Sequence, residues 1–214
     1  MKGRFLIICL LGVCMGLGSC TKEEKILIGG FGWDQVAILD RETQEIEWTH
    51  QLLPEEKGVN DVDWTSKGQI LIAYEGGARL ITLEHEVIWD FKVEPGQEMY
   101  SACELPSGDF LLAACAVPSR IITLNPAGEV KEEINFDTGV KQLHVQYRQI
   151  SMTDAGTFLI PLMGKGEVIE MAKDKEILHR ISVGGTPFSA KELPNGQWLV
   201  ACGDGHKFVT VDPE

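Results

Sequence analysis

The stretch SACELPSGDFLLAAC, residues 101–115, has a near copy in SAKELPNGQWLVACG, residues 189–203. Both join a short polar–apolar segment to an apolar run through a turn that contains Pro and Gly. Similar apolar runs recur along the chain at intervals of 40–48 residues, starting at Ile26, Ile70, Phe110, Phe158 and Trp198. Self-similarity at such a period indicates a protein built from structural repeats.

Turn residues precede the last four apolar runs. Each run has a glycine two residues before its start: Gly68, Gly108, Gly156 and Gly196. Glycine adopts positive φ without steric cost, so this spacing predicts a tight turn between two strands in each repeat.

The remaining segments of each repeat are also strand-like. They are short, rich in β-branched residues and separated by Gly, Pro or charged turns, and none has a sustained helical period. Four short strands in about 40 residues are typical of a propeller blade. The sequence therefore predicts an all-β fold, a β-propeller of four-stranded antiparallel blades. A β-sandwich and a β-helix are alternatives, although a sandwich does not require repeats and β-helix coils are shorter.

The first and last repeats are incomplete. The repeat pattern begins at its second strand, at Lys25, and the sequence stops in FVTVDPE after the third strand of the fifth unit. We therefore expect five units in an open arc, as a C-terminally truncated fragment of a larger propeller of about six to eight blades. A compact five-unit ring that closes imperfectly is the alternative.

The N-terminus has the features of a secretory signal. Lys2 and Arg4 precede an apolar run over residues 5–13, which is too short to span a bilayer. The following Leu-Gly-Ser-Cys, ending at Cys20, resembles the bacterial lipobox. This resemblance implies a signal peptide at 1–19 and a lipidated Cys20 within a linker at 20–24. The repeats then place the propeller domain at 25–214. An ordinary signal peptide that happens to contain Cys20 is the alternative.

The residues after Cys20 bear on localisation. Lys22, Glu23 and Glu24 resemble the export tag of surface lipoproteins in Bacteroidota. We expect an outer-membrane protein, anchored by lipid and facing the periplasm or the cell surface. A solvated linker explains the same charges.

The charge and the cysteine content argue against nucleic-acid binding and against a zinc site. The formal charge is −13, and loss of residues 1–19 removes two basic groups. Such a surface repels phosphate backbones, so nucleic acid is not an expected partner. Without Cys9, Cys14 and Cys20, three thiols remain in apolar stretches and no CxxC motif occurs, which predicts small buried side chains rather than zinc ligands.

One stretch resembles a known repeat family. AILDRETQEIEW, residues 37–48, is similar to the Trp motif of PQQ-like propeller repeats, with Asp40, Thr43 and Trp48 at the motif positions. The next repeat keeps Trp89, and later copies diverge. The resemblance implies that the tryptophans pack between neighbouring blades and that Asp and Thr tie the turn.

The innermost strands supply candidate binding residues. Aligned on the turn glycines, one column is apolar and its neighbour is polar; since side chains alternate along a strand, we expect the polar column to line the central channel. This column contains Asp61, Ser101, Gln149 and Ser189. Hydrogen bonds to neighbouring loops are the alternative role for these side chains.

A longer segment, residues 139–148, adds a second candidate. It contains Lys141, His144, Tyr147 and Arg148, a cationic and aromatic group in an acidic protein. Insertions in repeat proteins map to loops and often to the binding face. We predict binding of an anionic or sugar ligand here, with a solvated loop as the alternative.

No motif for catalysis, metal or cofactor binding stands out. The five histidines are scattered, and CGDGHKF at 202–208 lacks the residues of a P-loop. PQQ and calcium are not expected. By analogy with the propeller lipoprotein of the outer-membrane barrel assembly machinery, we predict a non-catalytic module that binds an envelope protein or glycan. A quinoprotein-like or arylsulfotransferase-like enzyme acting at the central channel is the rival hypothesis.

Overall fold

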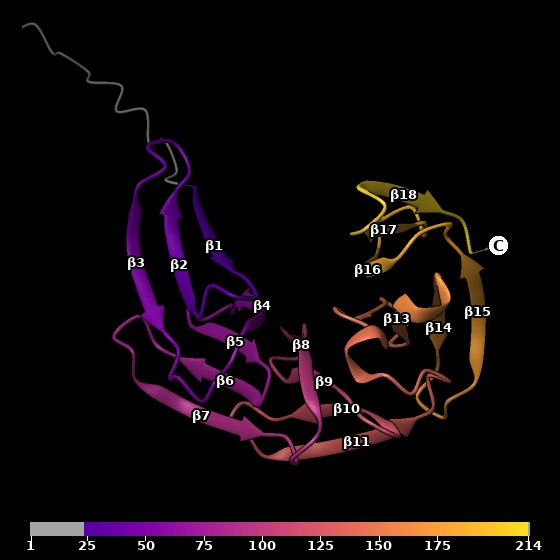
Figure 1. Ribbon diagram of the computed structural model, residues 1–214, viewed down its shortest axis with the longest axis horizontal. Coiled ribbons are helices and arrows are strands. Elements are labelled where there is room, and N and C mark those ends of the chain that lie inside the picture. Colours follow the sequence, from indigo (N-terminus) through magenta and orange to yellow (C-terminus); the bar gives the residue numbers. More distant parts are fainter. Residues whose placement is uncertain (1–23, 214) are drawn as a thin grey trace, which may run out of the picture.

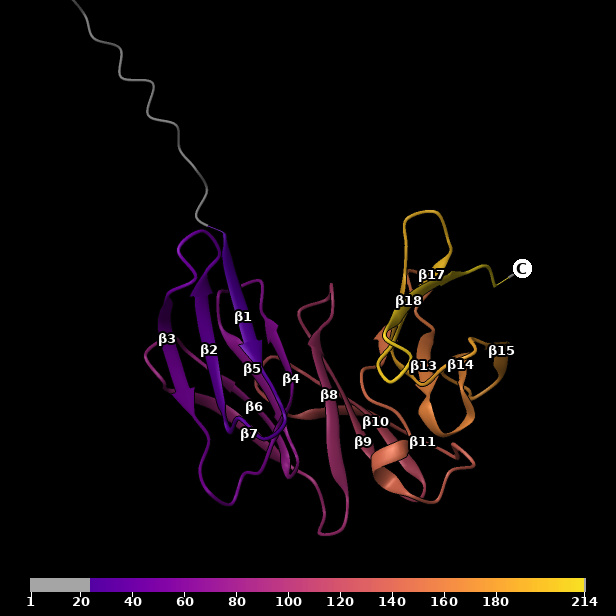
Figure 2. The ribbon, with the colours of Figure 1, turned by 45° about the horizontal axis from the view of Figure 1, so that its top comes forward.

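The structure is a computed structural model that describes residues 24–213. Five antiparallel sheets follow one another around a common axis as the blades of a β-propeller (Figure 1). The predicted all-β propeller is confirmed. Figure 2 shows from a second direction that the first and fifth blades lie at opposite ends of the arc. The predicted signal peptide at 1–19 and the predicted lipidation site Cys20 lie outside the described residues.

The strand order matches the predicted repeat. Blade 1 has three strands, blades 2 to 4 have four each, and blade 5 has three. Blade 1 contains β1 (Lys25–Gly29), β2 (Gln35–Asp40) and β3 (Ile46–Gln51); blade 2 contains β4 (Val59–Trp64), β5 (Ile70–Tyr74), β6 (Gly77–Ile81) and β7 (Val87–Lys92). Blade 3 contains β8 (Glu98–Glu104), β9 (Phe110–Cys115), β10 (Ser119–Leu124) and β11 (Val130–Phe136). Blade 4 contains β12 (Ser151–Met152), β13 (Phe158–Leu162), β14 (Glu167–Met171) and β15 (Ile177–Ser182), and blade 5 contains β16 (Pro187–Glu192), β17 (Trp198–Cys202) and β18 (Lys207–Val211).

Two short 3-10 helices complete the regular structure of residues 24–213: η1 (Leu143–Val145) and η2 (Met163–Lys165). Within this range, no helix is long and apolar enough to cross a membrane.

The turn glycines have the predicted conformation. Gly68, Gly108, Gly156 and Gly196 have φ between 71° and 83° and lie between the first and second strands of their blades. A side chain is disfavoured at such φ, which explains why glycine recurs at this point of the repeat.

The hydrophobic core lies between blades rather than within any one of them. Four clusters of buried side chains fill the boundaries between consecutive blades. Strands β5, β9 and β13 are buried along their whole length because a neighbouring blade covers each face. This double burial accounts for their continuous apolar runs. The outer strands β3 and β15 instead alternate between exposed and half-buried residues.

The motif tryptophans lie at blade boundaries. Trp48 of β3 donates a 2.8 Å hydrogen bond from Nε1 to the Leu83 carbonyl of blade 2. Trp89 of β7 is 7% exposed and packs edge-on against Phe110 of blade 3. In the turn of blade 1, Asp40 accepts hydrogen bonds from the Glu42 and Thr43 backbone, and the Thr43 hydroxyl accepts one from Glu45.

Blade 4 differs from the expected repeat at its inner strand. The alignment placed Gln149 on that strand, but β12 contains only Ser151 and Met152. The preceding segment folds into η1, and the Gln149 backbone N–H donates instead to Phe188 of blade 5 at 2.9 Å. The longer connection therefore shortens the inner strand and brings its start against the next blade.

Candidate functional site

The inner strands of blades 2 to 5 surround a central cavity of about 890 Å³. Its polar wall combines carboxylates, an amide, hydroxyls and one ammonium group, and its apolar wall comes mainly from alanine, leucine and methionine. The polar lining includes Asp61, Asp63, Glu104, Gln149, Ser151, Thr153, Ser189 and Lys191.

Asp61 is the polar centre of this cavity. Its Oδ1 accepts a 2.6 Å hydrogen bond from the Gln149 side-chain amide of blade 4, and its Oδ2 accepts a 3.2 Å bond from the Ala102 backbone N–H of blade 3. Its own neighbour Val62 also donates to Oδ1 at 3.0 Å. One carboxylate therefore connects three blades.

Burial changes the acidity of the cavity carboxylates. Loss of hydration raises the pKa of Asp61 to about 7, more than its hydrogen-bond donors lower it. Burial also raises the pKa of Asp63, which accepts a 3.2 Å bond from the Glu104 backbone N–H. Asp61 thus changes its charge near neutral pH.

The predicted polar column divides into two roles. Asp61, Gln149 and Ser189 line the cavity, whereas Ser101 is 1% exposed and does not line it. Ser101 was therefore wrongly expected to face the channel. Its Oγ accepts a 3.2 Å hydrogen bond from the Ile150 backbone N–H, so it ties blade 3 to blade 4. The two proposed roles of the column, channel lining and contact with neighbouring segments, are both present.

The residues of the 139–148 segment do not form one site. His144 is exposed on η1, and Tyr147 is fully buried and stacked near Phe136. The Arg148 guanidinium lies between the rings of Tyr100, at 4.2 Å, and Phe188, at 5.8 Å. None of these residues lines the central cavity. The predicted cationic and aromatic group is therefore dispersed, because the segment threads between blades instead of forming an external loop. Lys141 is exposed on the same segment.

Sequence reasoning missed four further residues of the cavity wall. Asp63, Cys103, Ser151 and Lys191 each follow a member of the polar column by two residues and line the cavity. Alternation along a strand places residues i and i+2 on the same face, so the signal was present in the alignment.

The structure also defines the positions of the thiols and of the potential metal ligands. Cys103, Cys115 and Cys202 are unpaired, and burial raises the pKa of Cys103 and Cys115 to about 12. Such thiols stay protonated at neutral pH and are poor nucleophiles. Residues 24–213 contain no group of three or more His, Cys, Asp or Glu placed to hold a metal ion.

Comparison with known proteins identifies the family. Residues 32–214 match the Mal s 1 allergenic protein-like family. The chain belongs to this family. No curated protein matches the chain.

Solved structures similar to this Mal s 1-like chain are also propellers or propeller-shaped. A protein of unknown function from Bacteroides caccae is 40% identical, with a TM-score of 0.85 over 90% of this chain and 70% of that chain. Virginiamycin B lyase from Staphylococcus aureus is 13% identical, with a TM-score of 0.67 over 90% of this chain and 64% of that one. A streptogramin B lyase has the same identity and TM-score over 88% and 62%. The similarity to the two lyases is one of fold alone.

Proposed function

We propose that this Mal s 1-like chain is a lipid-anchored envelope protein whose central cavity binds a protein or glycan partner without catalysis. Lipidation at Cys20 rests on the signal-like residues 1–19 and the lipobox-like sequence before the cysteine. The proposed location is the outer membrane, with the propeller facing the periplasm or the surface. A distant relation to PQQ-like repeats is supported by the Trp motif of blades 1 and 2.

The observation that carries the binding proposal is the composition of the cavity. Two of its carboxylates are already held in place by backbone N–H groups of blade 3, Asp61 by that of Ala102 and Asp63 by that of Glu104. Preorganised acceptors of this kind suit a partner that presents hydroxyl, amide or ammonium donors and little negative charge. Sugars and basic peptide segments both have that chemistry.

The anchor is tested separately from the binding. Wild-type protein and a Cys20→Ala variant are expressed in a bacterium that processes lipoproteins, and cells are labelled with radioactive palmitate. We expect label and membrane association only for the wild type. Equal label or equal membrane association in the variant overturns the lipidation proposal.

The binding is tested by capture from detergent-solubilised envelope. Ser189 lines the cavity, whereas Thr49 is an exposed polar residue on the outer strand β3. We expect the wild type and Thr49→Trp to retain the same component and Ser189→Trp to lose it, because a tryptophan at 189 obstructs part of the cavity. Retention by all three proteins contradicts binding in the cavity.

A propeller enzyme acting at the central channel is the second candidate, and one observation favours it. A carboxylate with a pKa near 7 in a cavity is a suitable general acid or base, and Asp61 has this property. The captured component is incubated with wild type and Asp61→Asn and followed by mass spectrometry. A mass change that requires Asp61 favours catalysis, and an unchanged component favours simple binding.

A further inference from the structure

Two carboxylates of the central cavity have no cation within ion-pair distance. Asp61 and Asp63 lie two residues apart on β4, so their side chains share the face that lines the cavity. Their hydrogen bonds come from an amide side chain and from backbone N–H groups. Within residues 24–213 neither forms an ion pair, whereas the buried Glu56, just before the same strand, pairs with Arg79.

Burial without a counter-charge distinguishes these two groups from other carboxyls of the chain. Burial raises the pKa of both, that of Asp61 to about 7. The other described carboxyls with a shifted pKa all have a lowered one: Asp40, Glu56, Asp90, Asp109 and Glu133. A cation supplied by a ligand would therefore remove an electrostatic cost that the chain itself leaves in place.

Both carboxylates have acceptor capacity left. A carboxylate has about four acceptor positions. Three donors, from blades 2, 3 and 4, occupy Asp61, and two backbone N–H groups occupy Asp63. The Cα atoms of residues two apart on a strand are separated by about 7 Å, which two hydrogen bonds of about 2.8 Å from one nitrogen can bridge. An ammonium group has three N–H donors, so it can donate to both side chains.

The charge of the whole cavity also favours a cation. Its lining contains four carboxylates and one ammonium group: Asp61, Asp63, Glu104 and Asp154 against Lys191. Lys191 is exposed, and the Cys103 thiol stays protonated at neutral pH because its pKa is about 12. The cavity therefore has a net negative charge that a cationic ligand would offset.

Half-buried apolar side chains lie beside these carboxylates. Val62, Leu105 and Met152 line the cavity and keep part of their surface exposed. Such a wall can cover the methylene stem of a long side chain whose charged end lies among the carboxylates.

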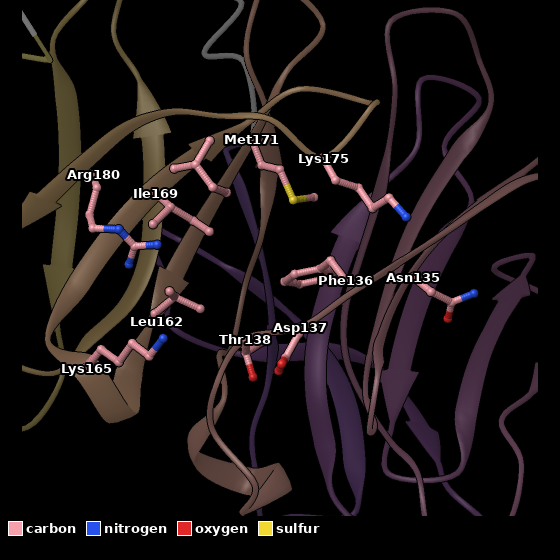
Figure 3. A pocket seen from close by; sticks show the side chains of 11 residues that line it. Asn135, Phe136, Asp137, Thr138, Leu162, Lys165, Ile169, Met171, Lys175 and Arg180 are labelled. Atoms are coloured by element: carbon pink, nitrogen blue, oxygen red, sulfur yellow. The ribbon is translucent and has the colours of Figure 1, made fainter.

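A smaller cavity of about 280 Å³, between β11 and blade 4, lacks such an accessible wall (Figure 3). Figure 3 shows Lys165 and Lys175 at its opposite ends. Its apolar side chains are 1–5% exposed and belong to the packed core: Phe136, Leu162, Ile169 and Met171. Of these two cavities, the central one is the better site for a side chain that enters from outside.

We propose that the central cavity binds a lysine side chain of a protein partner, with its ammonium group between Asp61 and Asp63. The stem lies against Val62, Leu105 and Met152. The proton that Asp61 holds at neutral pH leaves to solvent, and the ligand ammonium takes its place beside the carboxylate. This inference rests on the proposed function and selects a protein over a glycan, because the apolar wall fits an unbranched stem better than a ring of hydroxyl groups.

The test compares two blocked tripeptides, N-acetyl-Gly-Lys-Gly-amide and the same peptide acetylated on the lysine Nζ, in calorimetric titrations of the mature chain. Acetylation keeps the stem and removes the charge. We expect the free lysine to bind at least about tenfold more tightly, because a charge-assisted hydrogen bond is worth about that factor. The double variant Asp61→Asn/Asp63→Asn should lose the preference, and Asp204→Asn, an exposed aspartate between β17 and β18, should keep it. No binding, equal binding of the two peptides, or an unchanged preference in the double variant overturns the proposal.

The pH dependence of the same titration tests the position of the ammonium group. The ionised fraction of Asp61 rises about tenfold from about pH 6 to about pH 8, because its pKa is about 7, while lysine stays charged. The charged or titratable groups that act on Asp61 or on its neighbour are Asp63, Cys103, Glu104 and Lys191. We expect the affinity for the lysine peptide to rise about tenfold over this range and Asp61→Asn to remove most of the rise. A wild-type affinity that does not change with pH contradicts the placement beside Asp61.

Glucosamine distinguishes a lysine from an amino sugar. It has the same ammonium group on a ring of hydroxyls and cannot lay a stem along the apolar wall. We expect it to bind more weakly than the lysine peptide. Equal or tighter binding of glucosamine contradicts the choice of a protein ligand.

Capture from detergent-solubilised envelope separates this inference from the proposed function. The envelope is divided, and the lysines of one half are acetylated with acetic anhydride before both halves meet the wild-type chain. We expect a component to be retained from the untreated half only. Retention from both halves, lost in both with Ser189→Trp, leaves binding in the cavity intact and overturns lysine recognition. Retention from neither half contradicts the proposed function as well.

Discussion

The side-chain amide of Gln149 donates a 2.6 Å hydrogen bond to the carboxylate of Asp61, 88 residues earlier in the chain. The bond joins blade 4 to blade 2 across the central cavity, while the Ala102 N–H of blade 3 holds the second oxygen of the same carboxylate. Contacts between polar inner-strand groups thus replace side-chain packing near the axis. Farther out, the blades are held together by the apolar clusters at their boundaries.

The pH dependence of the free energy of unfolding should reflect the burial of Asp61. Its pKa rises from 3.8 to about 7 in the folded chain, so the folded state keeps a proton that the unfolded state releases. Stability from this group is therefore present below about pH 4 and declines as pH rises to about 7. The free energy of unfolding of wild type relative to Asp61→Asn should fall by roughly 2–4 kcal/mol over this range. Denaturant titrations at several pH values measure it, and a constant difference would contradict the burial of the charge.

The packing of Trp89 on Gly128 gives a test of the blade boundary with a matched control. Gly128 has φ 83° and a Cβ there would lie 2.6 Å from Trp89, whereas Gly108 has φ 82° with no atom within 4 Å of its Cβ position. Alanine at either site carries a similar backbone cost of about 1–2 kcal/mol. Gly128→Ala should lose a further 1–3 kcal/mol, roughly, from overpacking. Equal free energies of unfolding for the two variants would show that the indole does not occupy this position.

The pKa of His50 at the first blade boundary should depend on its neighbour His85. His50 and His85 approach through their Nδ1 atoms at 3.1 Å, under the ring of Trp48. Burial, and then the neighbouring His85, lower the pKa of His50 below 6.5. The corresponding stability is full above pH 6.5 and is lost as pH falls through the lowered pKa.

The substitution His85→Asn removes the second imidazole and keeps a residue that tolerates the φ of 67° at this position. We expect the pKa of His50 to rise toward 6.5, measured from its imidazole proton signals in an NMR titration. An unchanged pKa would mean that burial alone, without His85, determines the titration.

Most of the fold was predictable because its determinants are local and repeated. The turn glycines Gly68, Gly108, Gly156 and Gly196 and the apolar runs after them mark the first two strands of four blades. Strand count in the first and last units also followed from the pattern. The short inner strand of blade 4 could not be predicted from the pattern. The path of residues 139–150 depends on contacts with blade 5 that no local periodicity encodes.

The candidate site was predictable in part for a related reason. Alternation placed Asp61, Gln149 and Ser189 on one face, and extending it by two residues adds Asp63, Ser151 and Lys191. Alternation cannot distinguish a side chain that borders the cavity from one that a neighbouring blade covers, as with Ser101. The contact of Arg148 with the rings of Tyr100 and Phe188 was missed, since it depends on the distance between blades, which alternation does not give.

Binding at the central cavity is tested most directly by photo-crosslinking in intact cells. A benzophenone amino acid is placed at Lys191, an exposed residue that lines the cavity, or at Thr49 on the outer strand of blade 1. We expect a discrete adduct with an envelope protein or glycan from position 191 and none from position 49. An adduct from position 49 with none from position 191 would contradict it.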